Sequence, residues 1–388
     1  MVGSSVRGMV EPAIRFEHVR KEYPAVRGRA GAAVDDLTLE VRPHEVLVLV
    51  GPSGCGKSTT LRMANRLVEP TSGRILLEGE DVTHVDPVQL RRRIGYVIQD
   101  VGLFPHRTVA QNIATVPRLL GWDAKRTAAR VDELLDLVGL DAARYARRYP
   151  HELSGGERQR VGVARALATD PPVLLMDEPF GAVDPVGRRR LQTEFARIQR
   201  EVGTTVMLVT HDIDEAVRMG DRVAVLSTGA HVEQLASPLD VVARPATDAV
   251  ADLVGRGRLA RLLALGRLER TDVDEVPGPG PAAIGTVDVG TELGDVLATL
   301  LASPGDGADG RLDVVEAGRP VGSVTAATVL RALRRLTDAA GADGNEGDPD
   351  GSATTRGPAG SPDLDRRLPD PHRPGPDAGA DRVGTLPT

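Results

Sequence analysis

The stretch Gly51-Pro-Ser-Gly-Cys-Gly-Lys-Ser-Thr-Thr60 decides the fold of this chain. It follows the apolar run Glu45-Val-Leu-Val-Leu-Val50, which is typical of a buried strand, and it precedes a segment with helical spacing. A strand, a glycine-rich turn and a helix form the context in which G-x-x-x-x-G-K-[ST] indicates a phosphate site. An ordinary glycine-rich turn is the alternative, and the complete motif in this context argues against it. The sequence therefore predicts a nucleotide-binding P-loop.

The P-loop is expected to hold phosphates mainly through its backbone. Its glycines allow backbone N–H groups to lie close to phosphate oxygens, and the following helix N-terminus adds partial positive charge. Lys57 is expected to reach the β- and γ-phosphates, and the Ser58 hydroxyl to bind Mg²⁺. The residues assigned to nucleotide binding here are Gly51, Pro52, Ser53, Gly54, Cys55, Gly56, Lys57, Ser58 and Thr59.

Composition limits the other classes of function. The chain has 388 residues, enough for two domains with extensions, and its formal net charge of -7 gives no argument for binding nucleic acid. Aromatic residues make up 2%, so stacking platforms for single-stranded nucleic acid are not evident. The single cysteine, Cys55, excludes an intrachain disulfide and suits a reducing compartment.

The sequence offers no membrane-spanning segment. No apolar run approaches the roughly 18 residues that a spanning helix needs. The first ten residues lack the apolar core of a signal peptide. We therefore expect a soluble cytoplasmic protein that serves a membrane process only through a partner.

Strands alternate with helices through most of the chain, which predicts an α/β core with a largely parallel sheet. Residues 13–19 and 37–41 alternate apolar and polar side chains, as half-exposed strands do. Residues 109–168 have helical spacing, including a helix expected from Arg158 to Ala168. The apolar runs expected to form buried strands are 45–50, 94–99, 173–178, 204–210 and 223–226.

The pattern of the core ends near residue 255, so we place one domain at 13–255. Residues 256–284 include a Pro/Gly-rich stretch and are expected to form a linker. Residues 285–336 have a β-α-β-β-α pattern. Residues 337–388 have almost no large apolar side chains, which predicts a disordered tail.

Two consecutive acids follow the apolar strand that ends at Met176. Asp177 is placed to hold Mg²⁺, and Glu178 to act as general base or to orient the attacking water. Acids at a strand end are in themselves ordinary solvated carboxylates. The P-loop upstream favours the catalytic interpretation.

Three further residues have a structural alternative beside a functional one. Gln99, at a strand tip, could contact both Mg²⁺ and the lytic water, or be a surface glutamine. His211 follows a buried strand and could bind the γ-phosphate, although a lone histidine there is more often structural. Tyr23 could stack on adenine, although an aromatic residue before proline usually serves packing.

The segment Leu153-Ser-Gly-Gly-Glu-Arg-Gln159 predicts a second anion site, because a Ser-Gly-Gly turn opens another helix. One nucleotide needs only one phosphate cradle. The economical explanation is that this second cradle completes the nucleotide site of another copy of the chain.

These motifs together resemble the ATP-binding subunit of an ABC transporter over roughly residues 13–255. They stand in that family's order, with A-loop Tyr23, Walker A 51–58, Q-loop Gln99, signature 153–159, Walker B Asp177 with Glu178, D-loop Asp184 and H-loop His211. The resemblance implies a P-loop NTPase fold with a RecA-like core, an antiparallel β subdomain and a helical subdomain. It implies ATP and Mg²⁺ as ligands, with Mg²⁺ held by Ser58, Gln99 and Asp177.

The resemblance also implies partners. Two copies would pack head-to-tail, so that the signature segment, including Ser154, Gly155, Gly156 and Gln159, meets ATP held by the partner. Asp184 would contribute at the same interface. Membrane permease subunits would dock near Gln99 and hold the protein at the cytoplasmic face of the membrane, with a substrate-binding protein as an indirect partner.

Further stretches are similar to importers of quaternary amines and osmoprotectants, such as glycine betaine, carnitine, choline or proline betaine. They are residues 63–73, 95–106, 116–122 and 248–258. Relatives usually carry paired CBS motifs, whereas this chain has one convincing motif, Val287 to Leu336, so regulation by ionic strength or nucleotide is in question. Two subunits could each supply one motif.

Three alternatives remain at this point. The first is an importer for another small solute, because solute choice resides in other subunits. The second is a soluble ABC protein without a transport role, although such proteins usually carry two cassettes or a long coiled coil. The third is a regulatory switch with a ligand sensor at 285–336, although the intact Glu178 and His211 argue for catalysis.

Overall fold

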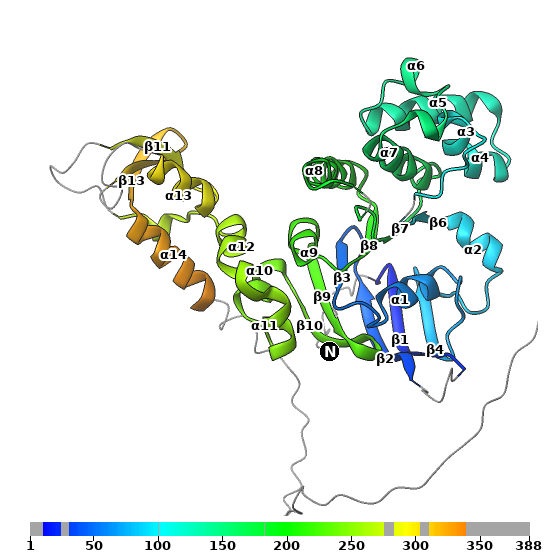
Figure 1. Cartoon of the computed structure of the whole chain (residues 1–388), viewed down its shortest axis with the longest axis horizontal. Helices are drawn as coiled ribbons and strands as arrows, with labels where there is room; N and C mark the ends of the chain where they lie inside the picture. The colour runs from blue at the N-terminus through cyan, green and yellow to red at the C-terminus, as the bar shows by residue number, and fades with distance from the viewer. Residues whose placement is uncertain are drawn as a thin grey trace, which may run out of the picture. The chain divides into compact units, whose positions relative to one another are not determined.

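The computed structural model describes residues 11–24, 31–99, 101–181, 183–274, 283–302 and 310–338, which belong to one compact unit. Most of the predicted tail at 337–388 lies outside these residues. Two sheets, a group of helices and a small C-terminal α+β part make up the described chain (Figure 1).

A six-stranded sheet forms the centre of the fold. Its strands lie in the order β10 (His231–Ala236), β9 (Arg222–Ser227), β3 (Val46–Val50), β8 (Thr205–Thr210), β7 (Val173–Asp177) and β6 (Ile94–Val97). All neighbours pair in parallel except β10, which is antiparallel to β9. Every residue of β3, β7 and β8 is buried, because helices and a second sheet cover both faces. The predicted largely parallel sheet is confirmed.

The second sheet is antiparallel, with the order β2-β1-β4-β5. Its strands are β1 (Ile14–Glu22), β2 (Ala32–Val41), β4 (Ser72–Leu77) and β5 (Glu80–Asp81). β1 and β2 are longer than the sequence predicts, because bulges interrupt the apolar alternation without ending the pairing. Their inward side chains pack with Leu47, Leu49 and Leu61 in one hydrophobic core.

Helices follow the strands of the central sheet. α1 (Lys57–Ala64) follows β3, α8 (Pro185–Val202) follows β7 and α9 (Ile213–Met219) follows β8. α2 (Pro87–Arg93) leads into β6. A separate helical group contains α3 (Val109–Ile113), α4 (Thr115–Leu119), α5 (Ala124–Leu137), α6 (Ala142–Tyr145) and α7 (Gly155–Ala166) (Figure 1).

The segment expected to be a linker contains regular structure. After α10 (Pro238–Ala243) and α11 (Asp248–Val254), the helix α12 (Arg258–Leu265) lies inside the expected linker at 256–284. α12 begins directly after a short 3-10 turn at Gly255–Gly257, and its Leu262 is buried in the main hydrophobic core. Tertiary packing therefore gives this segment a structure that its glycine-rich flanks do not suggest.

The C-terminal part forms a three-stranded sheet with two helices. Its elements are β11 (Gly285–Asp288), α13 (Leu293–Leu301), β12 (Leu312–Glu316), β13 (Arg319–Val324) and α14 (Ala326–Asp338), in the predicted β-α-β-β-α order. β11 and β12 are parallel, and β12 and β13 are antiparallel. Whether it is a CBS motif stays a prediction.

No helix within the described ranges combines the length and the apolar character that crossing a membrane requires.

Candidate functional site

The glycine-rich turn between β3 and α1 has a backbone that only glycine adopts easily. Gly54 and Gly56 have φ values of 81° and 113°. A Cβ on Gly56 would lie 2.4 Å from the carbonyl oxygen of Ala33 at the start of β2. α1 begins directly after Gly56 and has no side-chain cap at its N-terminus. Its first amides are therefore free of a competing side-chain acceptor, as a phosphate site requires.

The Lys57 ammonium lies inside this turn. Its Nζ donates hydrogen bonds to the carbonyl oxygens of Gly51 at 2.7 Å and Pro52 at 2.8 Å, and Lys57 is buried. Cys55 is also buried, with its Sγ 3.7 Å from Lys57 Nζ. The Cys55 side chain thus faces the core, and this residue can offer a phosphate only its backbone. Pro52 and Ser53 are exposed, and Thr59 is half-buried.

Ser58, in the first turn of α1, contacts Asp177 at the end of β7. The Ser58 hydroxyl donates to Asp177 Oδ1 at 2.8 Å, and Arg62 lies 3.6 Å from Asp177 Oδ2. A hydroxyl and a carboxylate suit Mg²⁺, which commonly uses one or two protein oxygens together with phosphate oxygens and water. The guanidinium beside Asp177 shows that this carboxylate already attracts a cation. These residues fit a magnesium site.

Two of the predicted catalytic side chains, Gln99 and His211, contact the carboxylate of Glu178. Its Oε2 accepts a hydrogen bond from Gln99 Nε2 at 3.3 Å and lies 3.2 Å from His211 Nδ1. The Glu178 backbone has a φ of 45°, a left-handed conformation that is uncommon for glutamate. Its N–H donates to the carbonyl oxygen of Val209 at 2.9 Å, which ties it to β8. Residues whose strained backbone is held in place by surrounding contacts are common at functional sites.

Two residues of this site, Arg62 and Tyr96, were not predicted from the sequence. Arg62 lies four positions after Ser58, so the helical repeat places both on one face of α1, and this spacing was a usable signal. Tyr96 lies on β6, where burial, and then the neighbouring Asp177 carboxylate, raise the pKa of its hydroxyl. Nothing in the sequence around Tyr96 distinguishes it from a packing residue.

Tyr23 lies immediately after β1 and remains exposed, with Lys21 Nζ 5.1 Å from the centre of its ring. The β1–β2 register pairs Glu22 with Ala32, next to Ala33, whose carbonyl approaches Gly56. This register brings the end of β1 to the side of the P-loop. An exposed ring there is placed where an adenine could stack.

The signature segment lies in the helical group. Ser154 caps α7, since its hydroxyl accepts from the Glu157 N–H at 3.3 Å while Glu157 Oε2 accepts from the Ser154 N–H at 2.7 Å. Tyr145 donates to Glu157 Oε1 at 2.6 Å. α7 starts at Gly155 rather than at the expected Arg158, because this capping box offsets the low helix propensity of two glycines. No hydrogen bond or ion pair between described residues joins 153–159 to the P-loop.

Gln159 is a buried residue of the signature segment. It is 2% exposed and lines a small pocket with Phe180 and Leu191. Its burial against α8 differs from the exposure of Ser154 at the start of the signature helix, and the assignment of Gln159 to nucleotide binding stays a prediction. The helical repeat turns this position toward α8, whereas Ser154 and Gly156 stand at the start of the helix.

Asp184 caps α8. Its Oδ1 accepts from the N–H groups of Val186 at 3.2 Å and Gly187 at 2.9 Å, and the residue is exposed. The structure does not bring it to Glu178 by a direct bond between the described residues.

Comparison with protein families and curated proteins gives consistent results. The family model described as ABC transporter matches residues 34–181. The chain is similar to the osmoprotectant import ATP-binding protein OsmV of Salmonella typhimurium, with 53% identity over 67% of this chain and 68% of that protein. It is also similar to the glycine betaine uptake system ATP-binding protein YehX of Escherichia coli, with 53% identity over 65% of this chain and 80% of that protein.

A third relative is the glycine betaine/carnitine/choline transport ATP-binding protein OpuCA of Bacillus subtilis, which is 46% identical over 68% of this chain and 66% of that protein. Among solved structures, the chain resembles the dimeric post-hydrolysis state of the ATP-binding cassette MJ0796 bound to ADP and Pi. That match has a TM-score of 0.52 and 32% identity, and covers 58% of this chain and 98% of the other.

Proposed function

This chain belongs to the ATP-binding proteins of ABC transporters, and on that premise we propose that it hydrolyses ATP to drive import of an osmoprotectant of the quaternary amine class. The observation that carries the catalytic part is the meeting of Gln99 and His211 on Glu178, beside the Ser58–Asp177 pair. The names of the relatives support the solute class, because they include osmoprotectant, glycine betaine, carnitine and choline transport.

ATP binding falls to the turn before α1. Backbone amides of the turn and of the first turn of α1 hold phosphate oxygens, and Lys57 exchanges its two carbonyl partners for the β- and γ-phosphates. Tyr23 stacks on adenine. Ser58, Asp177 and Gln99 are the residues that would hold Mg²⁺. When bound, this ion neutralises charge on the transferred phosphoryl group.

Hydrolysis falls to the cluster on Glu178. Its carboxylate accepts a proton from the attacking water, while Gln99 fixes the orientation of that carboxylate through the 3.3 Å hydrogen bond. His211 is exposed on the same side and donates to the γ-phosphate. The left-handed backbone of Glu178 holds the carboxylate in place, so the rate gain comes from positioning and electrostatics.

A second copy of the chain completes each site. The start of α7 offers the Ser154 hydroxyl and the first amides of a helix, yet no bond between described residues joins it to the P-loop of its own subunit. In a head-to-tail dimer, Ser154, Gly155 and Gly156 face the γ-phosphate held by the partner subunit, and Asp184 lies at the same interface. The dimeric cassette among the solved structures supports this arrangement.

A groove in the helical group fits a membrane partner. It has a volume of about 590 Å³, and Phe104, Arg107 and Leu119 are among its lining residues. Phe104 and Leu119 are exposed, and Leu120 beside them is exposed as well. This groove begins five residues after Gln99 in the chain. We assign it to a helix of a permease subunit, which holds the protein at the cytoplasmic face of the membrane.

The C-terminal part is assigned to regulation. Residues 285–336 form a single CBS-like motif, supported by the order and directions of β11, β12 and β13. The family resemblance implies paired motifs, so we infer that two subunits each supply one. The segment 256–284 connects this motif to the ATPase domain at 13–255 and includes α12.

The test is ATPase activity of the protein co-expressed with its permease subunits and reconstituted in liposomes with a substrate-binding protein. We expect stimulation by glycine betaine, carnitine, choline or proline betaine. Activity that responds to another small solute, and to no quaternary amine, would discard the solute class while keeping the ATPase assignment. Phe104→Asp should keep basal ATPase activity and lose the stimulation.

A further inference from the structure

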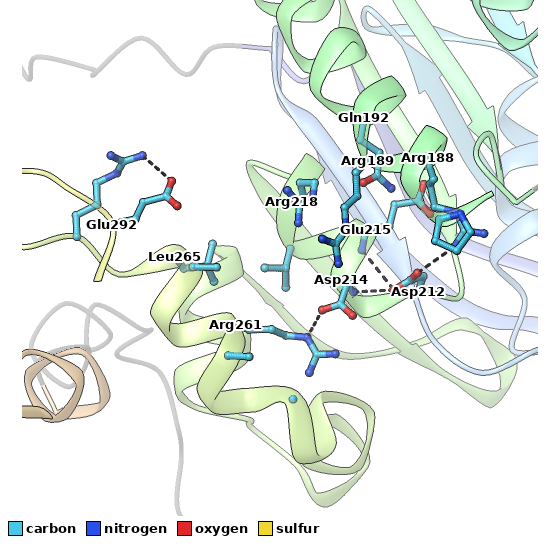
Figure 2. A pocket seen from close by; sticks show the side chains of 16 residues that line it. Arg188, Arg189, Gln192, Asp212, Asp214, Glu215, Arg218, Arg261, Leu265 and Glu292 are labelled. Carbon is cyan, nitrogen blue, oxygen red and sulfur yellow. Dashed lines mark hydrogen bonds and ion pairs between the residues drawn. The ribbon is translucent and has the colours of Figure 1, made fainter. Parts of the chain in front are cut away.

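A cleft of about 730 Å³ lies between α8, α9 and α12, outside the residues assigned to catalysis (Figure 2). One wall comes from the first two turns of α8 and from α9, which begins just after His211. The other wall comes from α12 and from Arg267 and Glu292 beyond it. The cleft therefore joins the ATPase core to the C-terminal part.

The cleft is lined by more arginine side chains than its ion pairs neutralise. Three of its arginines are paired with acids, Arg261 with Asp214 at 2.6 Å, Arg267 with Glu292 at 3.5 Å and Arg188 with Asp212 at 3.6 Å. Two more arginines, Arg189 and Arg218, line the same cavity and have no ion pair or side-chain hydrogen bond within the described part of the chain. Two guanidinium groups are thus left to face the cavity.

A buried polar group provides a second, independent observation. Glu215 lines the cleft and is 5% exposed. Its Oε2 accepts a hydrogen bond from Thr210 at 2.9 Å, but its Oε1 is buried and has no hydrogen-bond partner among the described residues. The Nε of Arg188, on the same wall, is also buried without a partner. Buried polar atoms are almost always hydrogen-bonded in proteins. Both atoms have almost no accessible surface, so a ligand in the cleft reaches them only if the side chains of this wall rearrange.

We propose that this cleft is a further anion-binding site, distinct from the P-loop and the signature turn, which takes a small phosphate monoester. A phosphate dianion matches the charge of Arg189 and Arg218, and guanidinium groups bind phosphate oxygens in a bidentate way. Val217, Ala264 and Leu265 form an apolar part of the lining that suits the organic portion of the ligand.

The cleft adjoins the segment that carries His211, so a bound ligand can affect catalysis. Glu215 is joined to Thr210, the residue directly before His211, and Arg188 is paired with Asp212, the residue directly after it. A ligand held between these residues and α12 would change how firmly the His211 segment is fixed. The inference does not depend on which solute is transported.

The test is a titration with inorganic phosphate, followed by ³¹P NMR, on full-length protein saturated with AMP-PNP and Mg²⁺. The triphosphate analogue fills the P-loop, so phosphate must bind at another site, and the arginine variants distinguish the cleft from the signature turn. We expect saturable binding at millimolar phosphate and none for acetate at the same ionic strength. The double variant Arg189→Ala/Arg218→Ala should weaken binding by at least about tenfold, since it removes both free guanidinium groups.

Arg190→Ala is the matched control, because Arg190 is exposed on the same helix but does not line the cleft. It should bind phosphate like the wild type. The proposal is overturned by the absence of saturable binding, by equal binding of acetate, by wild-type binding in the double variant, or by equal loss in the control. Thermal unfolding of each variant checks that it is folded. If the double alanine variant is unfolded, the double variant Arg189→Gln/Arg218→Gln takes its place.

Discussion

The turn before α1 and the turn before α7 both place glycines at the start of a helix, but they satisfy the helix amides differently. α1 has Gly56 at its N-cap, with no side-chain cap. α7 has Ser154 at its N-cap, and a capping box with Glu157 satisfies part of its N-terminus. The first turn depends on a ligand to complete it, because a helix N-terminus without a cap leaves amides unpaired. The second is already capped within one subunit, and in our proposal it contacts a ligand only in a dimer.

The two turns also differ in backbone and charge. The P-loop carries two glycines with positive φ, a buried lysine and a serine bonded to Asp177. Gly155 and Gly156 are ordinary helical residues, and the nearest atom to a Cβ on Gly156 would be Leu191 Cδ1, at 3.7 Å. Binding strength therefore resides in the first turn. In our proposal the second turn acts on hydrolysis rather than on binding.

The largest expected effect separates binding from turnover at the first turn. Glu178→Gln removes the carboxylate that accepts the proton from water, so turnover should fall about 100-fold to 10,000-fold. ATP binding and ATP-dependent dimerisation should persist, because the P-loop is untouched. Steady-state ATPase assays and size-exclusion chromatography with ATP measure the two properties. Normal turnover in this variant would remove Glu178 from its assigned role.

A smaller loss is expected from the second turn. Gly156→Glu has room to fold and places a negative charge where the partner's γ-phosphate would lie, so ATPase activity should fall about 100-fold. Monomeric ATP binding, measured by fluorescence of a nucleotide analogue, should stay at the wild-type level. Weaker monomeric binding would mean that the signature segment touches ATP within its own subunit.

The alanine variants of Gly56 and Gly156 compare the two turns by their effect on the free energy of unfolding. Gly56→Ala forces a Cβ to 2.4 Å from the Ala33 carbonyl oxygen at a φ of 113°, and should cost roughly 1–3 kcal/mol of unfolding free energy. Gly156→Ala improves helix propensity and should be neutral or stabilising by up to about 1 kcal/mol. Urea denaturation of both variants measures the difference. Equal costs would contradict the contrast between the two backbones.

The smallest effect concerns Glu215, at the His211 end of the first site. Burial raises the pKa of Glu215 from 4.5 to about 7. The folded state then binds more protons than the unfolded state between these values, so stability is lost as pH rises through about 7. We expect a loss of about 1 kcal/mol between pH 6 and pH 8, which Glu215→Gln should abolish. Denaturation at both pH values in both proteins checks this, and an identical loss in the variant would assign it to another group.

Much of the first site could be predicted because its parts are local in sequence. The P-loop pattern, the apolar run before Asp177 and the strand before His211 each place a residue at the end of a parallel strand, where such sites lie. The contacts of Gln99 and His211 with Glu178 were not themselves predicted, because they depend on how neighbouring strand ends lie in the folded sheet. Arg62 was missed although its spacing from Ser58 was visible.

The rest depends on tertiary packing. The burial of Gln159 against α8 and the helix α12 within the expected linker are set by contacts between distant segments. The cleft between α8, α9 and α12 joins residues more than 100 positions apart, from Pro185 to Glu292. No local pattern around Arg189 or Arg218 indicates that the two arginines share one cavity. Such sites appear only when the chain is folded.

The most direct test of the two-copy site mixes two inactive proteins, Lys57→Ala and Gly156→Glu. In a head-to-tail dimer of one of each, one site keeps an intact P-loop and an intact partner signature, so mixing should restore ATPase activity. Mixing Lys57→Ala with Glu178→Gln should restore none, because each site then has a defective P-loop side. A Lys57→Ala and Gly156→Glu mixture as inactive as its components would contradict the composite site, and with it the account of why this chain carries two anion-binding turns.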